Sequence, residues 1–315
     1  MKDNFADKLV AAVKQKGNPI CVGLDPRLNL LPKKIVEKAM KEKDLSPTKM
    51  AAEAIVEFNK GIIDAVKDIA PVVKPQIAFY EIFGADGVWA YQETIKYAKE
   101  NGMIVIADAK RNDIGSTAQA YAQSFLGEIP MFEETEHEVV MPIFNADSIT
   151  INAYLGWDGV KPFVEECGKY GRGAFILVKT SNPSSGDLQD LEVSTGQNVY
   201  EIMGTLVDSW GADLVGESGY SSIGAVVGAT YPKQAEVLRK LMPQSIFLVP
   251  GYGAQGGGAE DVKPCFNDDG LGAVVNSSRG IIFAYQKLDG FDEDSYADAA
   301  RQACLNMQED LRKVL

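Results

Sequence analysis

Short, nearly continuous apolar runs recur along the chain and alternate with longer amphipathic segments. Continuous apolar runs are typical of strands that are buried on both faces of a parallel sheet. The runs that predict strands are 18–25, 71–80, 102–110, 147–154, 173–180, 221–230, 244–251 and 270–278. Segments such as 48–69, 87–102 and 233–242 have helical character and lie between these runs. Eight strands alternating with helices predict either a (β/α)8 barrel or a large, open, doubly wound sheet.

The residues at the strand ends favour the barrel. No Gly-x-Gly-x-x-Gly pattern follows the first predicted strand, so the dinucleotide-binding form of the open sheet is disfavoured. Polar or special residues stand at nearly every strand end, namely Asp25, Lys74, Gln76, Asp108, Lys110, Asn152, Lys179, Ser181, Gly251, Ser277 and Arg279. In a barrel these ends converge on the carboxyl-terminal face, where active sites lie. The sequence therefore predicts the α/β class and a (β/α)8 TIM barrel, with residues 1–315 forming a single domain.

Two longer excursions interrupt the alternation of strands and helices. One covers residues 126–146, and the other is the Gly-, Ser- and Asp-rich segment 181–198. Both are expected to be surface insertions rather than domains. Because the second excursion follows the fifth predicted strand, it is a candidate lid over the site.

Composition narrows the possible partners. Lys and Arg total 31 against 44 Asp and Glu, which gives a net charge of -13. Nucleic acids and anionic membranes need a basic surface, so neither is an expected partner. No apolar window is long enough to span a membrane, and the charged amphipathic N-terminus does not resemble a signal peptide. The four cysteines are widely separated, which argues against disulfides and zinc and favours a reducing cytoplasm. The single histidine, His137, lies in an acidic run without a nucleophile turn nearby, which argues against a Ser-His-Asp triad.

A cluster of charges is predicted where the third strand ends. Asp108 and Lys110 are two positions apart, so on an extended strand both side chains point to the same face. Buried charges need partners, and Lys74 at the end of the second strand is the expected neighbour. With Asp113, two lysines and two aspartates would form a nearly neutral alternating cluster. For an isolated Asp-x-Lys pattern, a structural ion-pair network at the barrel rim is an equally good interpretation.

A second pattern predicts a phosphate site. Five glycines fall within residues 251–258, after the seventh strand, and Ser-Ser-Arg-Gly begins a helix after the eighth strand. Barrels often bind phosphate in this region through free backbone N–H groups and the positive end of a helix. Arg279 can bind phosphate with two hydrogen bonds, and Gln255 can add an amide donor. The alternative is a plain flexible turn.

Several motifs together resemble a known family. In chain order they are VGLDPR (22–27), VKPQIAFYE (73–81), DAKRNDIGST (108–117), VKTSNPSS (178–185) and VPGYGAQGG (249–257). With these motifs the chain resembles the orotidine 5'-phosphate decarboxylases, in particular their longer bacterial branch, from about residue 20 to 285. The resemblance implies a homodimeric (β/α)8 barrel that converts orotidine 5'-monophosphate to uridine 5'-monophosphate and CO2. This reaction ends de novo pyrimidine synthesis and uses no metal and no organic cofactor.

The resemblance also implies the roles of individual residues. The charged tetrad would be Lys74, Asp108, Lys110 and Asp113, with Lys110 stabilising the carbanion at C6 and protonating it. Asp113, Ile114 and Thr117 would reach into the partner subunit's site. Asp25 would bind the ribose hydroxyls. The remaining substrate-binding residues would be Asn152, Thr180, Ser181, Pro250, Gly251, Gln255, Gly256, Gly257, Ser278 and Arg279.

Three alternatives stay open from the sequence. A sugar-phosphate decarboxylase or aldolase of the same superfamily would hold Mg²⁺, but Lys74 stands where that metal would need an acidic ligand. A Schiff-base aldolase would need a neutral Lys110 or Lys179; flanking aspartates oppose this for Lys110, and a rim ion pair is the expected role of Lys179. A non-catalytic nucleotide-binding barrel should have lost a member of the tetrad, and all four are present.

Overall fold

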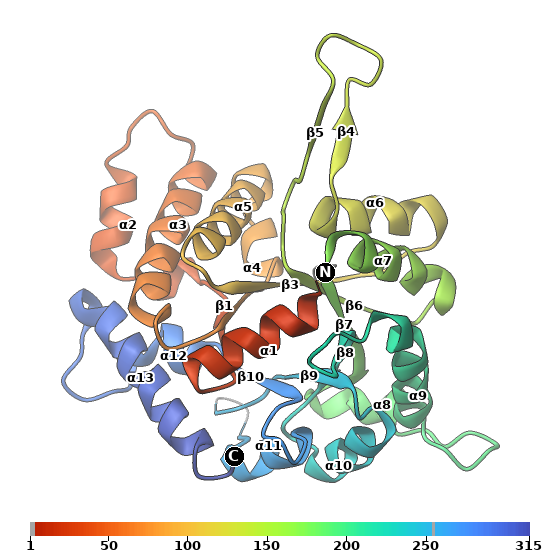
Figure 1. Ribbon diagram of the computed structural model, residues 1–315. Helices are drawn as coiled ribbons and strands as arrows, with labels where there is room; N and C mark the ends of the chain where they lie inside the picture. Colours follow the sequence, from red (N-terminus) through yellow and green to blue (C-terminus); the bar gives the residue numbers. More distant parts are fainter. Residues whose placement is uncertain (1–3, 254–255) are drawn as a thin grey trace. The chain divides into compact units, whose positions relative to one another are not determined.

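The structure is a computed structural model that describes residues 4–253 and 256–315, and its core is a closed barrel of eight parallel strands (Figure 1). The strands are β1 (Ile20–Leu24), β2 (Val72–Pro75), β3 (Ile104–Arg111), β6 (Ser148–Ile151), β7 (Gly173–Lys179), β8 (Ser221–Val227), β9 (Ser245–Val249) and β10 (Ala273–Ser277). They are neighbours in the order β1-β10-β9-β8-β7-β6-β3-β2. Every predicted strand is present, and the predicted (β/α)8 barrel is confirmed.

Helices follow most of the strands. They are α1 (Phe5–Lys16), α2 (Lys33–Met40), α3 (Pro47–Val66), α4 (Ala78–Glu81), α5 (Gly84–Glu100), α6 (Gly115–Leu126), α7 (Trp157–Tyr170), α8 (Gly186–Gln189), α9 (Val199–Gly211), α10 (Pro232–Leu241), α11 (Ala259–Val262), α12 (Arg279–Ile282) and α13 (Tyr296–Leu311). The three segments that predicted helices correspond to α3, α5 and α10. None of the helices in the described part of the chain is long and apolar enough to cross a membrane.

Local sequence signals explain where several of these elements begin and end. Helix α3 begins with Ser46, whose Oγ accepts a hydrogen bond from the backbone N–H of Lys49 at 3.1 Å, and Pro47 occupies the first helical position. Gly171 caps the end of α7 directly after Tyr170, and its φ of +62° is a conformation that glycine adopts without steric cost. The predicted strand 71–80 is too long, because β2 stops at Pro75 and α4 begins at Ala78.

The chain divides into two compact units, each of them discontinuous in sequence. The larger unit comprises Met1–Ala12, Lys110–Val275 and Val314–Leu315; the smaller unit comprises Val13–Ala109 and Asn276–Lys313. Strands β3 and β10 each contribute residues to both units. The core of the larger unit includes an edge-to-face contact between Phe5 and Phe175, with ring centroids 5.9 Å apart. In the smaller unit, Phe58 stacks on Tyr296 at 5.2 Å. The expected domain extent, 1–315 with two insertions, stays a prediction.

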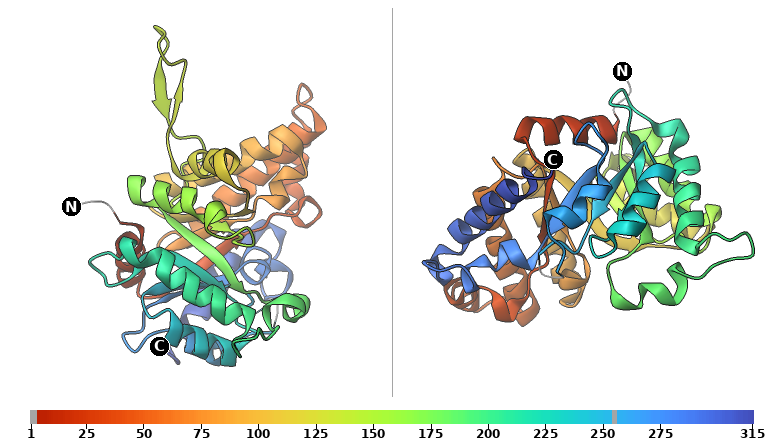
Figure 2. Two further views of the ribbon diagram at one scale, coloured as in Figure 1. Left: turned by 90° about the vertical axis from the view of Figure 1, so that its right-hand side faces the viewer. Right: turned by 90° about the horizontal axis from the view of Figure 1, so that it is seen from below.

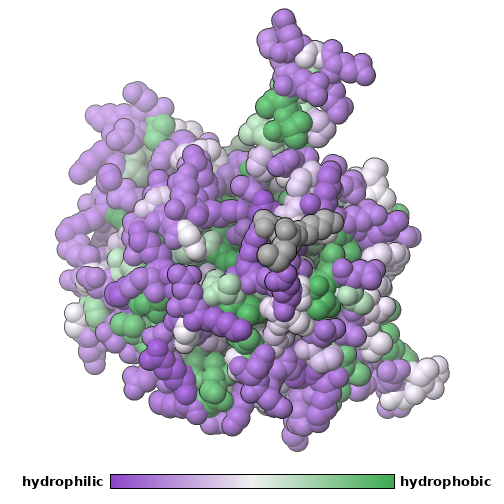
Figure 3. Space-filling view, viewed as in Figure 1, coloured by the Kyte–Doolittle hydropathy of each residue, from purple (hydrophilic) through white to green (hydrophobic). Residues whose placement is uncertain are grey.

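The excursion at residues 126–146 contains an antiparallel hairpin that the sequence analysis did not anticipate. Its strands are β4 (Ile129–Met131) and β5 (Val139–Met141), and the hairpin stands away from α6 and α7 (Figures 1 and 2). Four of its apolar side chains are exposed, namely Phe132, Val139, Val140 and Met141. The space-filling view shows a hydrophilic tip beyond this hydrophobic part of the hairpin (Figure 3).

Candidate active site

Lys74 and Asp108 form a buried ion pair in the smaller unit. The Lys74 Nζ atom lies 2.7 Å from Asp108 Oδ2, and the two side chains are only 6% and 9% exposed. Strands β2 and β3 pair in parallel with Val72 opposite Ile104, and this register brings the two strand ends together. The predicted contact between Lys74 and Asp108 is therefore confirmed.

Burial alone would lower the pKa of Lys74, but the negative charges of Asp108 and Asp25 outweigh burial and raise this pKa above its ordinary value. Lys74 is consequently a permanent cation at neutral pH. A group of three or more His, Cys, Asp or Glu side chains suited to a metal ion is not found among residues 4–253 and 256–315.

Asp25 directly follows β1 and has an unsatisfied oxygen. Its Oδ1 atom is buried and has no hydrogen-bond partner within the described part of the chain. An unpaired buried carboxylate oxygen is costly, and hydroxyl donors of a ligand would satisfy it. The nearby backbone is tightly packed, because a Cβ atom on Gly23 would lie 1.8 Å from the Oγ of Ser278. Asn276 Nδ2 in turn donates to that Oγ at 3.3 Å.

Lys110 has an unusual backbone conformation. Its φ angle is +48°, in the left-handed region that residues other than glycine rarely occupy. Because the backbone is not regularly extended at Lys110, strand alternation alone does not establish that Asp108 and Lys110 point to one face, and that expectation stays a prediction. The backbone N–H of Lys110 donates to Thr150 Oγ1 at 3.0 Å, and Thr150 is buried on β6. Such conformations cluster at functional sites, where the surroundings hold them.

The turn that follows β3 carries the residues expected to reach a partner subunit. Asp113 Oδ1 accepts a hydrogen bond from the N–H of Ile114 at 2.8 Å. The side chain of Ile114 is 53% exposed, and Thr117 is exposed in the first turn of α6. Gly159 of α7 packs against this turn, because a Cβ atom there would lie 2.9 Å from the Asp113 carbonyl oxygen.

Asn152 and Thr180 use their side chains to shape the chain at the ends of β6 and β7. Asn152 Oδ1 accepts a hydrogen bond from the N–H of Tyr154 at 3.0 Å. Gln189 holds Thr180 with two hydrogen bonds, since its Oε1 accepts from the Thr180 N–H and its Nε2 donates to Thr180 Oγ1, both at 2.9 Å. Ser181 lies against Gly228, where a Cβ atom would be 2.8 Å from the Ser181 Cα atom.

The glycine-rich loop after β9 is closed by its own hydrogen bonds. The N–H groups of Gly253, Gly256 and Gly257 donate to loop carbonyls at 2.7, 2.9 and 3.2 Å. Gly251 and Gly256 have φ angles of +101° and +94°, which glycine adopts without strain. The expectation that the loop presents free N–H groups is therefore not met by these three.

The other residues expected at the phosphate come from both compact units. Gln255 lies outside the described residues. Pro250 accepts a hydrogen bond at its carbonyl from the N–H of Ala229 at 2.9 Å. Ser278 is half-buried, and Arg279 is exposed as the first residue of α12. An exposed guanidinium next to a half-buried hydroxyl suits an anion, so Arg279 is the strongest candidate for phosphate binding among these residues.

Sequence reasoning missed two features of the larger unit. The first is Thr150, whose hydroxyl holds the backbone of Lys110. The second is the partner of Lys179, which pairs with Asp190 at 2.7 Å, so the expected ion pair of Lys179 is confirmed. The alternation in the fourth predicted strand could have marked Thr150 as inward-facing, but no pattern pointed to Asp190.

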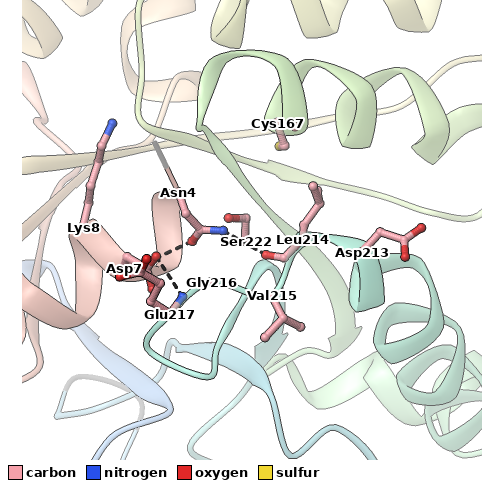
Figure 4. Close-up of a pocket in the computed structure, with 11 residues that line it drawn as sticks. Asn4, Asp7, Lys8, Cys167, Asp213, Leu214, Val215, Gly216, Glu217 and Ser222 are labelled. Atoms are coloured by element: carbon pink, nitrogen blue, oxygen red, sulfur yellow. Dashed lines mark hydrogen bonds between the residues drawn. The ribbon is translucent and has the colours of Figure 1, made fainter. Parts of the chain in front are cut away.

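The larger unit also contains a cavity of about 440 Å³ that is separate from these residues (Figure 4). Asn4, Asp7 and residues 213–217 contribute to its lining, and Asn4 Nδ2 donates to the Leu214 carbonyl oxygen at 3.0 Å. Asp7 accepts from the N–H groups of Glu217 and Ser218 at 3.1 and 2.7 Å. The lining of this cavity includes none of the residues predicted for the site, so the cavity is not part of the candidate active site.

Comparisons with known proteins agree on one family. The family described as Orotidine 5'-phosphate decarboxylase / HUMPS family matches residues 18–289. The chain is 45% identical over 311 residues to the orotidine 5'-phosphate decarboxylase of Rhodopirellula baltica, covering 98% of this chain and 99% of that protein.

Two solved structures are also similar. Leishmania donovani OMP decarboxylase is 31% identical with a TM-score of 0.70, covering 97% of this chain and 99% of that one. Leishmania donovani UMP synthase is 32% identical with a TM-score of 0.71, and this chain spans 57% of its length. The match to the family extends over most of the sequence, and the similarity in structure extends over nearly all of it. The chain belongs to the orotidine 5'-phosphate decarboxylase / HUMPS family.

Proposed function

We propose that the protein is a carboxy-lyase that converts orotidine 5'-monophosphate to uridine 5'-monophosphate and CO2. The observation that carries this proposal is the buried Lys74–Asp108 pair beside Asp25, whose carboxylate oxygen has no partner among the described residues. This arrangement occurs in a chain that belongs to the decarboxylase family. It also speaks against the metal-dependent sugar-phosphate alternative, because the Lys74 cation occupies a position where a metal would need an acidic ligand.

The reaction requires a cation beside C6 of the pyrimidine. When the bond between C6 and the carboxylate breaks, its electron pair stays on C6 in an orbital that lies in the plane of the ring. The ring π-system does not delocalise that pair, so stabilisation comes from a preorganised positive charge. We assign this role to the ammonium group of Lys110, which then gives C6 the proton that replaces CO2. Lys110 regains its proton from solvent after the product leaves.

The carboxylates of the tetrad are proposed to position the ammonium group of Lys110. Asp108 and Asp113 precede and follow Lys110 closely in the chain, and opposite charges at short range attract one another. Lys74 compensates the charge of Asp108, as their 2.7 Å contact indicates. We propose that the alternation of charges fixes Lys110 before the substrate binds, so that little reorganisation is needed during the reaction.

The other residues are proposed to bind the parts of the nucleotide. Asp25 accepts hydrogen bonds from ribose hydroxyls, which would satisfy its buried Oδ1. Thr180 and Ser181 meet the pyrimidine, and Asn152 is the weakest member of this group because its side chain is already used in a turn. The phosphate and the edge of the pyrimidine are bound by Pro250, Gly251, Gln255, Gly256, Gly257, Ser278 and Arg279.

We further propose that two copies of the chain form a homodimer, with Asp113, Ile114 and Thr117 reaching the partner's site. The exposure of Ile114, an apolar side chain in a turn next to the tetrad, supports this arrangement. Exposed apolar side chains are commonly covered at interfaces.

The direct test is to mix the purified protein with orotidine 5'-monophosphate and follow the fall in ultraviolet absorbance as uridine 5'-monophosphate forms. An excess of a metal chelator is included, and conversion is expected to proceed at the same rate with and without it. Tight binding of uridine 5'-monophosphate without conversion would support a non-catalytic barrel instead. Conversion that stops with the chelator would contradict the metal-free mechanism.

A further inference from the structure

Lys179 is a buried cation that the proposed reaction does not use. It is the last residue of β7, and its side chain is 0% exposed. Its Nζ atom lies 2.7 Å from Asp190 Oδ1 and 3.1 Å from Ser185 Oγ. The same atom lies 4.2 Å from the centre of the Tyr231 ring, which adds a cation–π contact. A buried ammonium group is costly unless it is paired and hydrogen-bonded, so these contacts are needed to keep Lys179 in place.

Both hydrogen-bonding partners of Lys179 belong to the excursion at residues 181–198. Asp190 also joins the far end of that excursion, because its carbonyl oxygen accepts a hydrogen bond from Asn198 Nδ2 at 2.8 Å. Gln189, the residue before Asp190, holds Thr180 with two hydrogen bonds. A single short stretch, Gln189 and Asp190, therefore ties the excursion to the end of β7 and to its own last residue.

The ion pair is asymmetric in its exposure. The Asp190 side chain is 38% exposed, whereas the Lys179 side chain is not exposed at all. If the excursion opened, the Lys179 ammonium group would lose both the carboxylate of Asp190 and the hydroxyl of Ser185 as partners. Leaving one partner of such a pair unpaired is strongly destabilising. The closed arrangement is thus favoured by the cation beneath it.

We propose that Lys179 is a positioning residue that holds residues 181–198 in their folded conformation beside the site. Through Asp190 and Ser185 it fixes the conformation in which Thr180 and Ser181 meet the pyrimidine ring. This inference rests on the proposed function, which assigns the pyrimidine to Thr180 and Ser181.

The test compares Asp190→Asn with Asp187→Asn, a matched loss of one carboxylate in the same excursion. Asp187 is exposed in α8 and takes no part in the contacts described above. In Asp190→Asn, we expect the Kd of uridine 5'-monophosphate to rise about tenfold, while the Kd of ribose 5-phosphate changes by less than about twofold. Calorimetric titration of each variant measures both constants. A general loss of stability would not separate the two ligands in this way.

Cleavage by thermolysin gives a readout that does not depend on function. Leu188 and Leu191 are exposed, and the excursion resists cleavage only while its backbone stays folded. We expect Asp190→Asn to be cut within residues 181–198 several times faster than either the wild type or Asp187→Asn. Mass spectrometry of the fragments identifies the position of the cut.

A double variant separates positioning from folding. Lys179→Met with Asp190→Asn removes the buried charge, so thermal stability should recover relative to Asp190→Asn alone. The weakened binding of uridine 5'-monophosphate should remain, because the ion pair between residues 179 and 190 is still missing. Wild-type binding and wild-type resistance to thermolysin in Asp190→Asn would overturn the proposal, as would recovery of nucleotide binding in the double variant. If the wild type neither bound uridine 5'-monophosphate nor converted the substrate, the proposed function would be wrong. The thermolysin experiment would then be the test of whether the Lys179–Asp190 pair holds residues 181–198 in place.

Discussion

Replacing Thr150 by valine should impair the reaction without unfolding the protein. The change removes the Oγ1 atom that accepts the hydrogen bond from the Lys110 N–H at 3.0 Å, and it keeps a β-branched side chain of similar shape in a site that is 1% exposed. Lys110 has φ +48°, and a left-handed backbone at a residue other than glycine costs about 1–3 kcal/mol. The hydrogen bond therefore opposes a real tendency of Lys110 to relax.

The magnitude follows from the value of one hydrogen bond. A net contribution of about 0.5–1.5 kcal/mol corresponds to a loss of roughly twofold to twelvefold in the population of the observed conformation. Because Lys110 is exposed, water partly replaces the lost acceptor, so we expect a fall of about fivefold rather than the upper limit. The loss should appear in kcat with KM nearly unchanged, since Lys110 acts on the transition state.

Steady-state kinetics with orotidine 5'-monophosphate measure this effect, and Thr150→Ser is the matched control. Serine keeps the oxygen but removes a methyl group, so it should lower thermal stability and retain kcat. If Thr150→Val kept the wild-type kcat, or if Thr150→Ser lost as much activity as Thr150→Val, the proposed role of the Thr150 hydroxyl would be refuted.

Three further substitutions test the assigned roles. Lys110→Ala should reduce turnover by more than about a thousandfold while uridine 5'-monophosphate still binds, because the cation at C6 is lost but the nucleotide contacts remain; near-normal turnover would contradict the assignment. Arg279→Ala should weaken uridine 5'-monophosphate by about 2 kcal/mol and leave uridine binding unchanged, and calorimetry that found equal losses for both ligands would remove the phosphate role. Mixing Lys110→Ala with Asp113→Ala chains should restore part of the activity if Asp113 acts across a dimer, and mixed dimers that form but stay inactive would exclude a shared site.

The barrel strands were predictable because strands buried on both faces consist mostly of consecutive apolar residues. Strands β1 and β9 are buried along their whole length, and their residues form nearly continuous apolar runs in the sequence. The same apolar pattern made the predicted strand 71–80 too long, because Ile77 and Tyr80 are also buried but belong to a helical turn. Periodicity does not separate a short buried helix from a strand.

The features that escaped prediction depend on contacts distant in sequence or on rare backbone conformations. The positive φ of Lys110 has no signal in the sequence, because the usual marker of that region is glycine. Lys179 pairs with Asp190 because the polar segment 181–198 folds back onto the end of β7. The residues of β5 are all exposed, so they show none of the alternation that marks a half-buried strand. In each case the observed conformation or contact depends on tertiary structure and not on the conformational preferences of the local sequence.

The β4–β5 hairpin has a consequence for how separate molecules meet in solution. An isolated two-stranded ribbon leaves both of its edges open, and open edges with exposed valine and methionine favour pairing with other chains. Four glutamates, Glu133, Glu134, Glu136 and Glu138, occupy the connection between its strands. Ribbons of two molecules that approach one another therefore bring like charges together, and this repulsion opposes aggregation. Salt screens it, so the colloidal stability of the protein should fall as ionic strength rises.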